Sequence, residues 1–195
     1  MLSPWLVVAL GYLLGNVLPA EWAVRRKTGR TPHELGDNPG GAGTWRLAGP
    51  LAGVLVTLFD VGKGAFVAAL AERAGLHGGW LVLAAVAPVA GHNWPWQRRF
   101  RGGRGLGPAT GVLLWLAWRW MLPAYALGAL VAWWRRWVPM VGIVAFPAGL
   151  LAMHLGGAPE ERFQAAFAVC LAVAVRQLPW ALREPELLRQ RLGLR

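Results

Sequence analysis

Three clusters of polar residues interrupt a chain that is otherwise strongly apolar. The first is a glycine-rich stretch at residues 36–46, with the sequence Gly-Asp-Asn-Pro-Gly-Gly-Ala-Gly-Thr-Trp-Arg. So many glycines leave backbone N–H groups free to converge on an anion, and Arg46 supplies positive charge beside them. A flexible loop would have the same composition, so composition alone does not decide between the two.

The second cluster is an ionisable pair, Asp60 and Lys63, inside an apolar run. The two residues are three positions apart and therefore fall on one face of a helix. Charged residues within an apolar run are costly and indicate a functional site by default. A structural ion pair that only satisfies itself explains the pattern as well, and the sequence leaves both interpretations open.

The third cluster surrounds His92 and continues into a second glycine-rich turn, Phe100-Arg101-Gly102-Gly103-Arg104-Gly105. Glycines directly before a helix N-terminus are typical of an anion site, because free N–H groups and the helix dipole point at the ligand. The spacing and the Lys-Ser/Thr pair of a nucleotide-binding P-loop are absent. His92 alone is typical of a structural histidine, but its place beside this turn makes it a candidate site residue.

Together the three clusters predict a binding site for phosphate or a phospho-compound where the membrane meets the cytoplasm. The few carboxylates and histidines have no metal-ligand spacing, so we expect neither a metal ion nor another cofactor. Ser3 is the only serine and lies at the amino terminus, which argues against a Ser-His-Asp hydrolase. Cys170 is the only cysteine, so no disulfide can form within one chain.

The composition indicates a membrane protein. Of the 195 residues, 56% are hydrophobic and only 15% are charged, well to the apolar side of soluble domains. The net charge of +11 is compatible with nucleic-acid binding, but the arginines cluster in short gaps between apolar runs instead of forming a stripe. That arrangement is typical of cytoplasmic loops, so we expect membrane lipid and no nucleic acid as a partner.

We predict a single domain, residues 1–195, with an all-α fold: a polytopic membrane bundle of about seven transmembrane helices. Arg119 and Pro123 divide what hydropathy alone would join into one long helix. The expected spans are residues 4–24, 47–71, 80–96, 106–118, 121–134, 138–154 and 163–176.

The basic residues orient these spans. Sixteen of the twenty Lys and Arg residues fall in the first, third and fifth segments between spans and in the carboxyl-terminal tail. The segments on the opposite side of the membrane hold only Arg73, Arg119 and Arg162, and Lys63 lies within a span. The positive-inside rule then places the amino terminus outside and the carboxyl terminus in the cytoplasm. Tryptophans near the span ends, such as Trp80, Trp133 and Trp134, fit the headgroup level of a bilayer.

The three clusters resemble the PlsY family, bacterial membrane acyltransferases that use acyl phosphate to acylate glycerol 3-phosphate. The family pattern is G-S-G-N-P-G-A-T-N-x-x-R-x-x-G, then D-x-x-K-G, then G-H-x-x-P-x-F-x-x-F-x-G-G-K-G. The chain matches this pattern at Asn38, Pro39, Gly40, Arg46, Gly49, Asp60, Lys63, Gly64, Gly91, His92, Pro95, Phe100, Gly102, Gly103 and Gly105, with Arg104 in place of the lysine. The family also has seven spans with the amino terminus outside.

Several polar residues of the family are replaced. Pro32 stands where the family has arginine, and apolar or different residues stand at Gly36, Ala42, Gly43, Pro139, Gly142, Gln177 and Trp180. Basic residues are kept at Arg136, Arg176 and Arg183. The glycine loops are thus better preserved than the hydroxyl and amide groups that could orient a polyol phosphate.

The resemblance implies an acyltransferase of phospholipid biosynthesis in the cell inner membrane, with its active face toward the cytoplasm. Its substrates would be acyl phosphate and glycerol 3-phosphate, and its products lysophosphatidic acid and phosphate. The implied catalytic residues are Lys63, His92 and Arg46, and the implied phosphate-binding residues are Asn38, Gly40, Gly102, Gly103, Arg104 and Gly105. The replaced positions leave two alternatives, a non-catalytic homologue that binds lipid phosphate or a partner enzyme, and an acyltransferase with a different acceptor.

Overall fold

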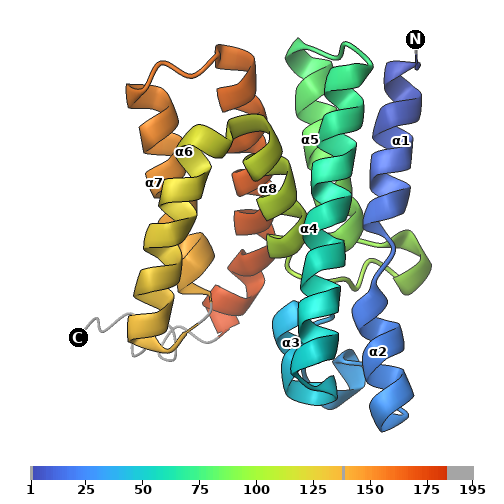
Figure 1. The fold of residues 1–195 in the computed structure, drawn as a ribbon. Helices are drawn as coiled ribbons and strands as arrows, with labels where there is room; N and C mark the ends of the chain where they lie inside the picture. The colour runs from blue at the N-terminus through green and yellow to red at the C-terminus, as the bar shows by residue number, and fades with distance from the viewer. Residues whose placement is uncertain (1, 138, 184–195) are drawn as a thin grey trace.

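The computed structural model describes residues 2–137 and 139–183, and every regular element in them is helical. The expected all-α class is thereby confirmed. The long helices run side by side, with α1, α4 and α5 in one group and α7, α8 and the second half of α6 in the other (Figure 1). In chain order the elements are α1 Pro4–Gly15, α2 Pro19–Thr28, η1 His33–Leu35, α3 Gly41–Ala48, α4 Pro50–Arg73, α5 Gly78–Asn93, η2 Trp96–Arg98, α6 Leu106–Arg135, α7 Met140–Leu155 and α8 Glu160–Arg183.

The first expected span, residues 4–24, is two helices instead of one. Helix α1 ends at Gly15, and α2 begins at Pro19. Proline has no N–H to give to the preceding turn, and it disfavours a helical conformation in the residue before it; Leu18 accordingly has φ −117° and ψ 85°. The break leaves carbonyl groups at the end of α1 without helical partners, which becomes important at the site.

The division expected near Arg119 and Pro123 is present, but it lies earlier. Ala117 has non-helical angles, φ −143° and ψ 32°, within the segment Leu106–Arg135. At this point the chain reverses, and the two halves of α6 run in opposite directions (Figure 1). Pro123 lies inside the second half, six residues after Ala117, where it removes the N–H that would bond to the carbonyl of Arg119.

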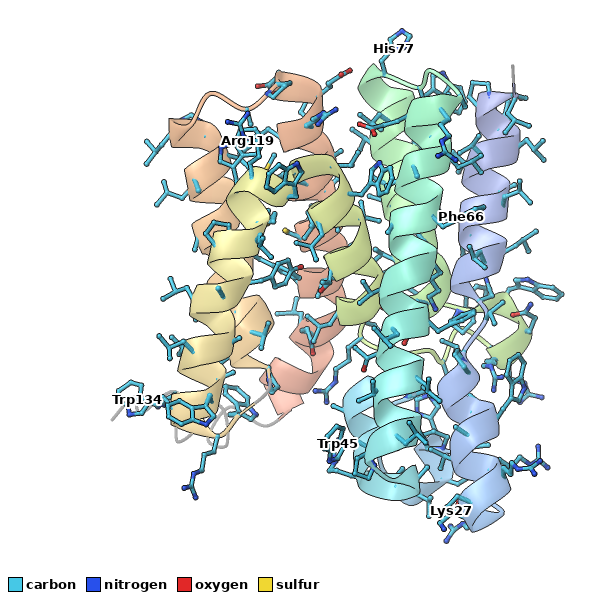
Figure 2. All side chains as sticks on the ribbon, in the orientation of Figure 1. Lys27, Trp45, Phe66, His77, Arg119 and Trp134 are labelled. Atoms are coloured by element: carbon cyan, nitrogen blue, oxygen red, sulfur yellow. The ribbon has the colours of Figure 1, made fainter. Side chains whose placement is uncertain are left out.

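The surface of the bundle is suited to lipid. By length and composition, three described stretches can cross a membrane, Pro4–Thr28, Pro50–Arg73 and Leu106–Arg135, and α7 is apolar but shorter. Large apolar side chains face outward on these helices, as Phe66 does in the second half of α4 (Figure 2). Lys27, Trp45 and Trp134 lie at one end of the bundle, and His77 and Arg119 lie at the other (Figure 2).

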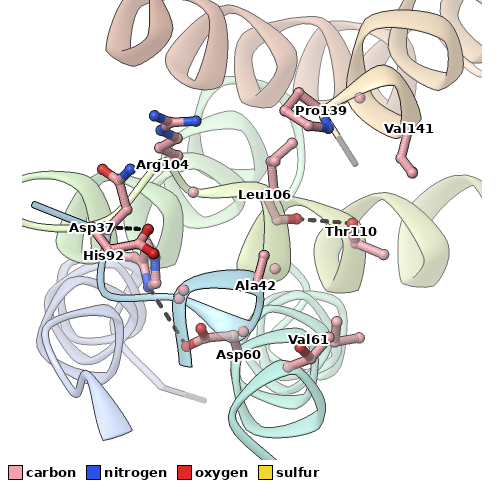
Figure 3. Close-up of a pocket in the computed structure, with 18 of the residues that line it drawn as sticks. Asp37, Ala42, Asp60, Val61, His92, Arg104, Leu106, Thr110, Pro139 and Val141 are labelled. Carbon is pink, nitrogen blue, oxygen red and sulfur yellow. Dashed lines mark hydrogen bonds and ion pairs between the residues drawn. The ribbon is translucent and has the colours of Figure 1, made fainter. Parts of the chain in front are cut away.

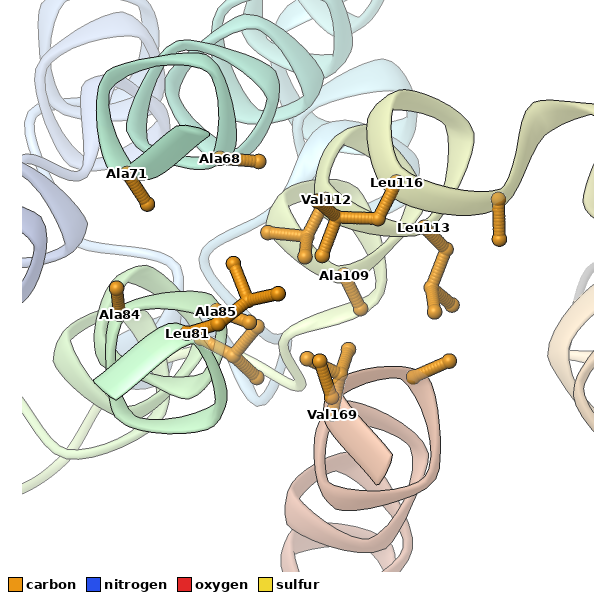
Figure 4. Close-up of a cluster of buried hydrophobic side chains, with 14 of the residues drawn as sticks. Ala68, Ala71, Leu81, Ala84, Ala85, Ala109, Val112, Leu113, Leu116 and Val169 are labelled. Carbon is orange, nitrogen blue, oxygen red and sulfur yellow. The ribbon is translucent and has the colours of Figure 1, made fainter. Parts of the chain in front are cut away.

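The interior is built from small side chains. Figure 4 shows alanines of α4 and α5 facing valines and leucines of α6 and α8, for example Ala68, Ala85, Val112 and Val169. Each of these four residues is completely buried. In lipid the packing of close-fitting surfaces holds helices together, since apolar burial alone gives no advantage there.

Glycines allow α4 and the first half of α6 to approach each other closely. A Cβ atom at Gly64 would overlap the carbonyl oxygen of Pro108, and one at Gly111 would overlap the carbonyl oxygen of Val61. Both neighbours are backbone atoms and cannot move aside cheaply. This contact fixes the start of α6 against the middle of α4.

We therefore expect Gly64→Ala to destabilise the protein by about 1–3 kcal/mol through overpacking. Gly62→Ala is the matched control, because no atom lies within 4 Å of a Cβ at Gly62. That variant should be neutral or slightly stabilising. Thermal unfolding in detergent measures both, and equal midpoints for the two variants would contradict the close contact.

Candidate active site

The ammonium group of Lys63 is buried at the junction of three helices. It lies 2.8 Å from Asp60 Oδ1 and 3.0 Å from His92 Nδ1. It also donates to the carbonyl oxygens of Gly15 at 3.2 Å and Val17 at 2.9 Å, the groups exposed by the break between α1 and α2. The three N–H groups of the cation thus serve the imidazole and the end of α1, and the cation pairs with Asp60 by charge, since Asp60 Oδ1 accepts no hydrogen bond within the described part of the chain.

This arrangement fixes the histidine. The contact from Lys63 Nζ gives His92 Nδ1 the role of acceptor, which places the ring proton on Nε2 in the neutral tautomer. A Cβ atom at Gly103 would overlap His92 Nε2, so this edge of the ring lies directly against the glycine turn. Asp60 Oδ1 is 3.6 Å from His92 Nδ1 and keeps negative charge beside the ring.

The glycine turn before α6 is held from both sides. The Gly103 N–H donates to the carbonyl oxygen of His92 at 2.9 Å. From α8, Arg176 donates through Nε to the Gly103 carbonyl at 2.9 Å and through Nη2 to the Gly102 carbonyl at 3.0 Å. A side chain at Gly102 would collide with His92 and Pro95. The glycines are therefore required by close packing of the turn.

A cavity of about 330 Å³ lies in front of these groups. In Figure 3 its charged end is formed by Asp37, His92 and Arg104, and Thr110, Pro139 and Val141 lie toward its other end. The lining comprises Asp37, Asn38, Gly40, Gly41, Ala42, Gly43, Arg46, Thr57, Asp60, Val61, His92, Arg104, Gly105, Leu106, Gly107, Thr110, Tyr125, Pro139, Val141 and Gly142.

Two helix N-termini converge on this cavity. The first turn of α3 contributes Gly41, Ala42 and Gly43 to the lining, and the first turn of α6 contributes Leu106 and Gly107. The first N–H groups of a helix have no acceptor within the helix and carry partial positive charge. A group bound between the two ends would meet N–H donors from both, an arrangement suited to an anion.

Two arginines complete the charged end. Arg46 forms a two-point contact with Asp37, 3.0 Å from Nε to Oδ2 and 2.7 Å from Nη2 to Oδ1. With the Asn38 amide oriented by its hydrogen bonds, its oxygen accepts from Arg104 Nε at 3.1 Å and Nη2 at 3.0 Å. The first glycine loop therefore orients both guanidinium groups.

Burial of Asp37 raises the pKa of its carboxyl, but the hydrogen bonds from Arg46 and from the Asn38 N–H outweigh burial, and the pKa lies below its usual range. The contact with Arg46 is thus complete above the ordinary carboxyl pKa and is lost only as the pH falls through the lowered one. Around the cavity, four cations (Arg46, Lys63, Arg104 and Arg176) exceed the two carboxylates, so the site remains positive.

The structure brings most of the expected site residues together. The residues that line the cavity are Asn38, Gly40, Arg46, His92, Arg104 and Gly105. Lys63, Gly102 and Gly103 lie behind the wall, where they support His92 and the turn. Lys63 therefore acts on the cavity through Asp60 and His92, and not by lining it.

Sequence reasoning undervalued four residues. Asp37 orients Arg46, and Arg176 holds the glycine turn. For Arg176 the signal in the sequence is a charged residue within an apolar run. Thr110 and Tyr125 also line the cavity. No spacing or motif distinguishes them from ordinary helix residues, because only the reversal of α6 brings them together.

Some of the replaced family positions line the cavity and others do not. Ala42, Gly43, Pro139 and Gly142 line the cavity, while Gly36 and Gln177 do not. Trp180 and Arg183 lie outside the residues whose side chains the structure describes. The loss of side-chain donors at Pro139 and Gly142 therefore changes the wall of the cavity itself.

A helical membrane bundle with a positively charged cavity at one end defines the class of protein, and comparison with known proteins defines the family. Residues 5–184 match the family model described as Glycerol-3-phosphate acyltransferase, and the chain belongs to that family. It is 40% identical over 157 residues to glycerol-3-phosphate acyltransferase 4 of Dehalococcoides mccartyi, covering 80% of this chain and 85% of the relative. It is 34% identical over 172 residues to the enzyme of Symbiobacterium thermophilum, covering 87% and 85%.

Solved structures agree with this assignment. Crystal structures of PlsY, an integral membrane glycerol 3-phosphate acyltransferase, superpose on the chain in two forms. The glycerol 3-phosphate form gives a TM-score of 0.81 at 25% identity, covering 97% of this chain and 94% of that one. The lysophosphatidic acid form gives 0.82 at 26% identity, covering 98% and 93%. The chain therefore shares an integral membrane fold with these proteins.

The buried Lys63 network makes a testable prediction. Lys63→Met leaves Asp60 as a lone buried charge and should destabilise the protein by about 3–5 kcal/mol. In the double variant with Asp60→Asn, the lone charge is gone, so the loss should be smaller than the sum of the two single losses. Unfolding of the three variants in detergent measures this coupling. Strict additivity would show that the pair is not a unit.

Proposed function

We propose that this protein transfers an acyl group from acyl phosphate to glycerol 3-phosphate, giving lysophosphatidic acid and inorganic phosphate, at the cytoplasmic face of the cell membrane. The observation that carries the proposal is the convergence of two helix N-termini with Arg46 and Arg104 on one cavity within a membrane bundle. Membership of the glycerol-3-phosphate acyltransferase family supports it.

The donor is an activated mixed anhydride, so the protein mainly has to position the substrates and stabilise charge. A hydroxyl oxygen of glycerol 3-phosphate attacks the acyl carbon and forms an ester bond. The bond from that carbon to the phosphate oxygen breaks, and phosphate leaves with the bonding electrons and takes up the hydroxyl proton directly, while the Nε2–H of His92 can donate a hydrogen bond to one of its oxygens. Arg104 and the N–H groups of α3 and α6 stabilise the negative charge on the leaving phosphate.

Lys63 is a positioning residue in this mechanism. Its contacts keep Asp60 and His92 in place and hold the end of α1 beside them. Gly102 and Gly103 act in the same indirect way, because their carbonyl groups are bound by Arg176. Asn38, Gly40 and Gly105 belong to the phosphate-binding wall.

The acyl chain has an apolar route to the cavity. A second hollow, of about 480 Å³, lies on the flank of α3 and α4 and shares Gly41, Ala42, Arg46 and Thr57 with the cavity. Its remaining lining, Trp45, Val54 and Leu58, is exposed on the outer surface of the bundle. A lipid-borne donor can therefore place its chain on the membrane side and its phosphate in the charged end.

Seven passes through the membrane fit the helices, if α1–α2 count as one pass and the halves of α6 as two. The start of α1 and the end of α8 lie at opposite ends of the bundle, as an odd number of passes requires (Figure 1). The basic loops lie at the same end of the bundle as the last residues of α8, which supports a cytoplasmic location for the site.

Arg104→Gln tests the phosphate-binding role. We expect kcat/KM for acyl transfer to fall at least about 100-fold, since a charged group that stabilises the leaving phosphate is lost. Arg104→Lys should retain more of the activity because it keeps the charge. Arg101→Gln, in the same turn but outside the cavity lining, is the matched control and should behave as the parent. Full activity of folded Arg104→Gln would contradict the proposed role.

The orientation is tested with single cysteines in a Cys170→Ala background. A membrane-impermeant maleimide should label Ser3→Cys in intact cells, because the amino terminus faces outward. Thr28→Cys, at the end of α2, should react only after the cells are permeabilised. The opposite labelling pattern would invert the proposed topology.

A further inference from the structure

Two hydroxyl-bearing side chains lie together in the part of the cavity lining that carries no charge. Tyr125 comes from the second half of α6 and Thr110 from the first half, and the reversal of α6 places the two hydroxyl groups beside each other. The neighbouring lining, from residues 139 to 142, is apolar or glycine. A few polar groups in an apolar wall are what fixes the orientation of a small ligand.

The Tyr125 side chain packs against α7 and buries its hydroxyl at the cavity wall. Its ring packs edge-on against Phe146 of α7, with centroids 6.3 Å apart and an interplanar angle of 86°. Its oxygen is buried and makes no hydrogen bond within the described part of the chain. An unsatisfied buried hydroxyl costs free energy on folding, so its retention at a cavity wall points to a partner that arrives with the ligand.

The hydrogen-bonding capacity of the pair defines that partner. The Thr110 hydroxyl already donates to the Leu106 carbonyl at 2.8 Å, so its oxygen can only accept from a ligand. The Tyr125 hydroxyl lies beside that oxygen and is the group of the pair whose proton can be turned toward a ligand. An alcohol hydroxyl matches both roles at once, while a phosphate or carboxylate oxygen offers no proton to Thr110.

We propose that Tyr125 and Thr110 bind the hydroxyl of the acyl acceptor that is not acylated, and so select a polyol phosphate and orient its other hydroxyl for attack. The inference rests on the proposed function and deepens it. A hydroxyl that accepts from Tyr125 and donates to Thr110 is unsuited to attack, so the reacting hydroxyl is the other one. In glycerol 3-phosphate the bound hydroxyl is then the secondary one, and the primary one attacks.

The test compares glycerol 3-phosphate with 3-hydroxypropyl phosphate, which keeps the primary hydroxyl and lacks the secondary one. The parent should have a kcat/KM about tenfold or more higher for glycerol 3-phosphate. In Tyr125→Phe, kcat/KM for glycerol 3-phosphate should fall about 3- to 10-fold, and the value for the analogue should not change. Thr110→Val should reduce the preference in the same direction.

Tyr12→Phe is the matched control. It makes the same chemical change at the only other tyrosine, whose hydroxyl donates to the Trp94 carbonyl at 2.7 Å and does not line the cavity. The preference for glycerol 3-phosphate should stay at the parent value in this variant. Melting curves identify the folded variants, and if Tyr125→Phe does not fold, Thr110→Val decides the question.

Three results would overturn the inference: an unchanged preference in the folded variants, an equal loss on both acceptors, or a parent that does not distinguish the two. The second would show that the side chains only pack the wall. If the parent acylates glycerol 3-phosphate and the variants keep the same preference for it, this inference alone is wrong and the proposed function stands. A parent that acylates neither acceptor removes the proposed function and this inference together.

Discussion

The ammonium group of Lys63 is the contact on which the site depends. It pairs by charge with the carboxylate of Asp60 and donates hydrogen bonds to the ring of His92 and to the open end of α1. Removing any of these groups leaves another without a partner in a region of low dielectric, where an unpaired charge is costly. The break before Pro19 is therefore part of the site, since it supplies the carbonyl groups that α4 binds.

Backbone N–H groups join the side chains of Arg46 and Arg104 at the charged end of the cavity. Helices α3 and α6 present N–H groups, and glycines allow the loops to approach closely enough for these groups to converge. A site of this kind tolerates the replacement of polar side chains better than one made of hydroxyl and amide groups. The chain can therefore belong to the family although Pro139 and Gly142 replace polar residues, because the charged end of the cavity does not use these two positions.

Much of the fold follows from the sequence, because apolar runs, basic gaps and prolines determine helices in lipid. The reversal of α6 was expected near Arg119 and Pro123 and lies at Ala117, since hydropathy detects a break without giving its position. Motif spacing identified the cavity-lining Arg46, His92 and Arg104. It did not reveal that Lys63 lies outside the cavity lining, nor that Tyr125 lies beside Thr110, because both facts depend on how helices pack against one another.

The central claim is that this cavity catalyses acyl transfer from acyl phosphate to glycerol 3-phosphate. The most direct measurement is the reaction of the purified protein in a lipid mesophase with both substrates, following phosphate and lysophosphatidic acid in the same samples. The account predicts that the two products appear in equal amounts and at the same rate. Phosphate without the lipid, or neither product from protein shown to be folded, would contradict it.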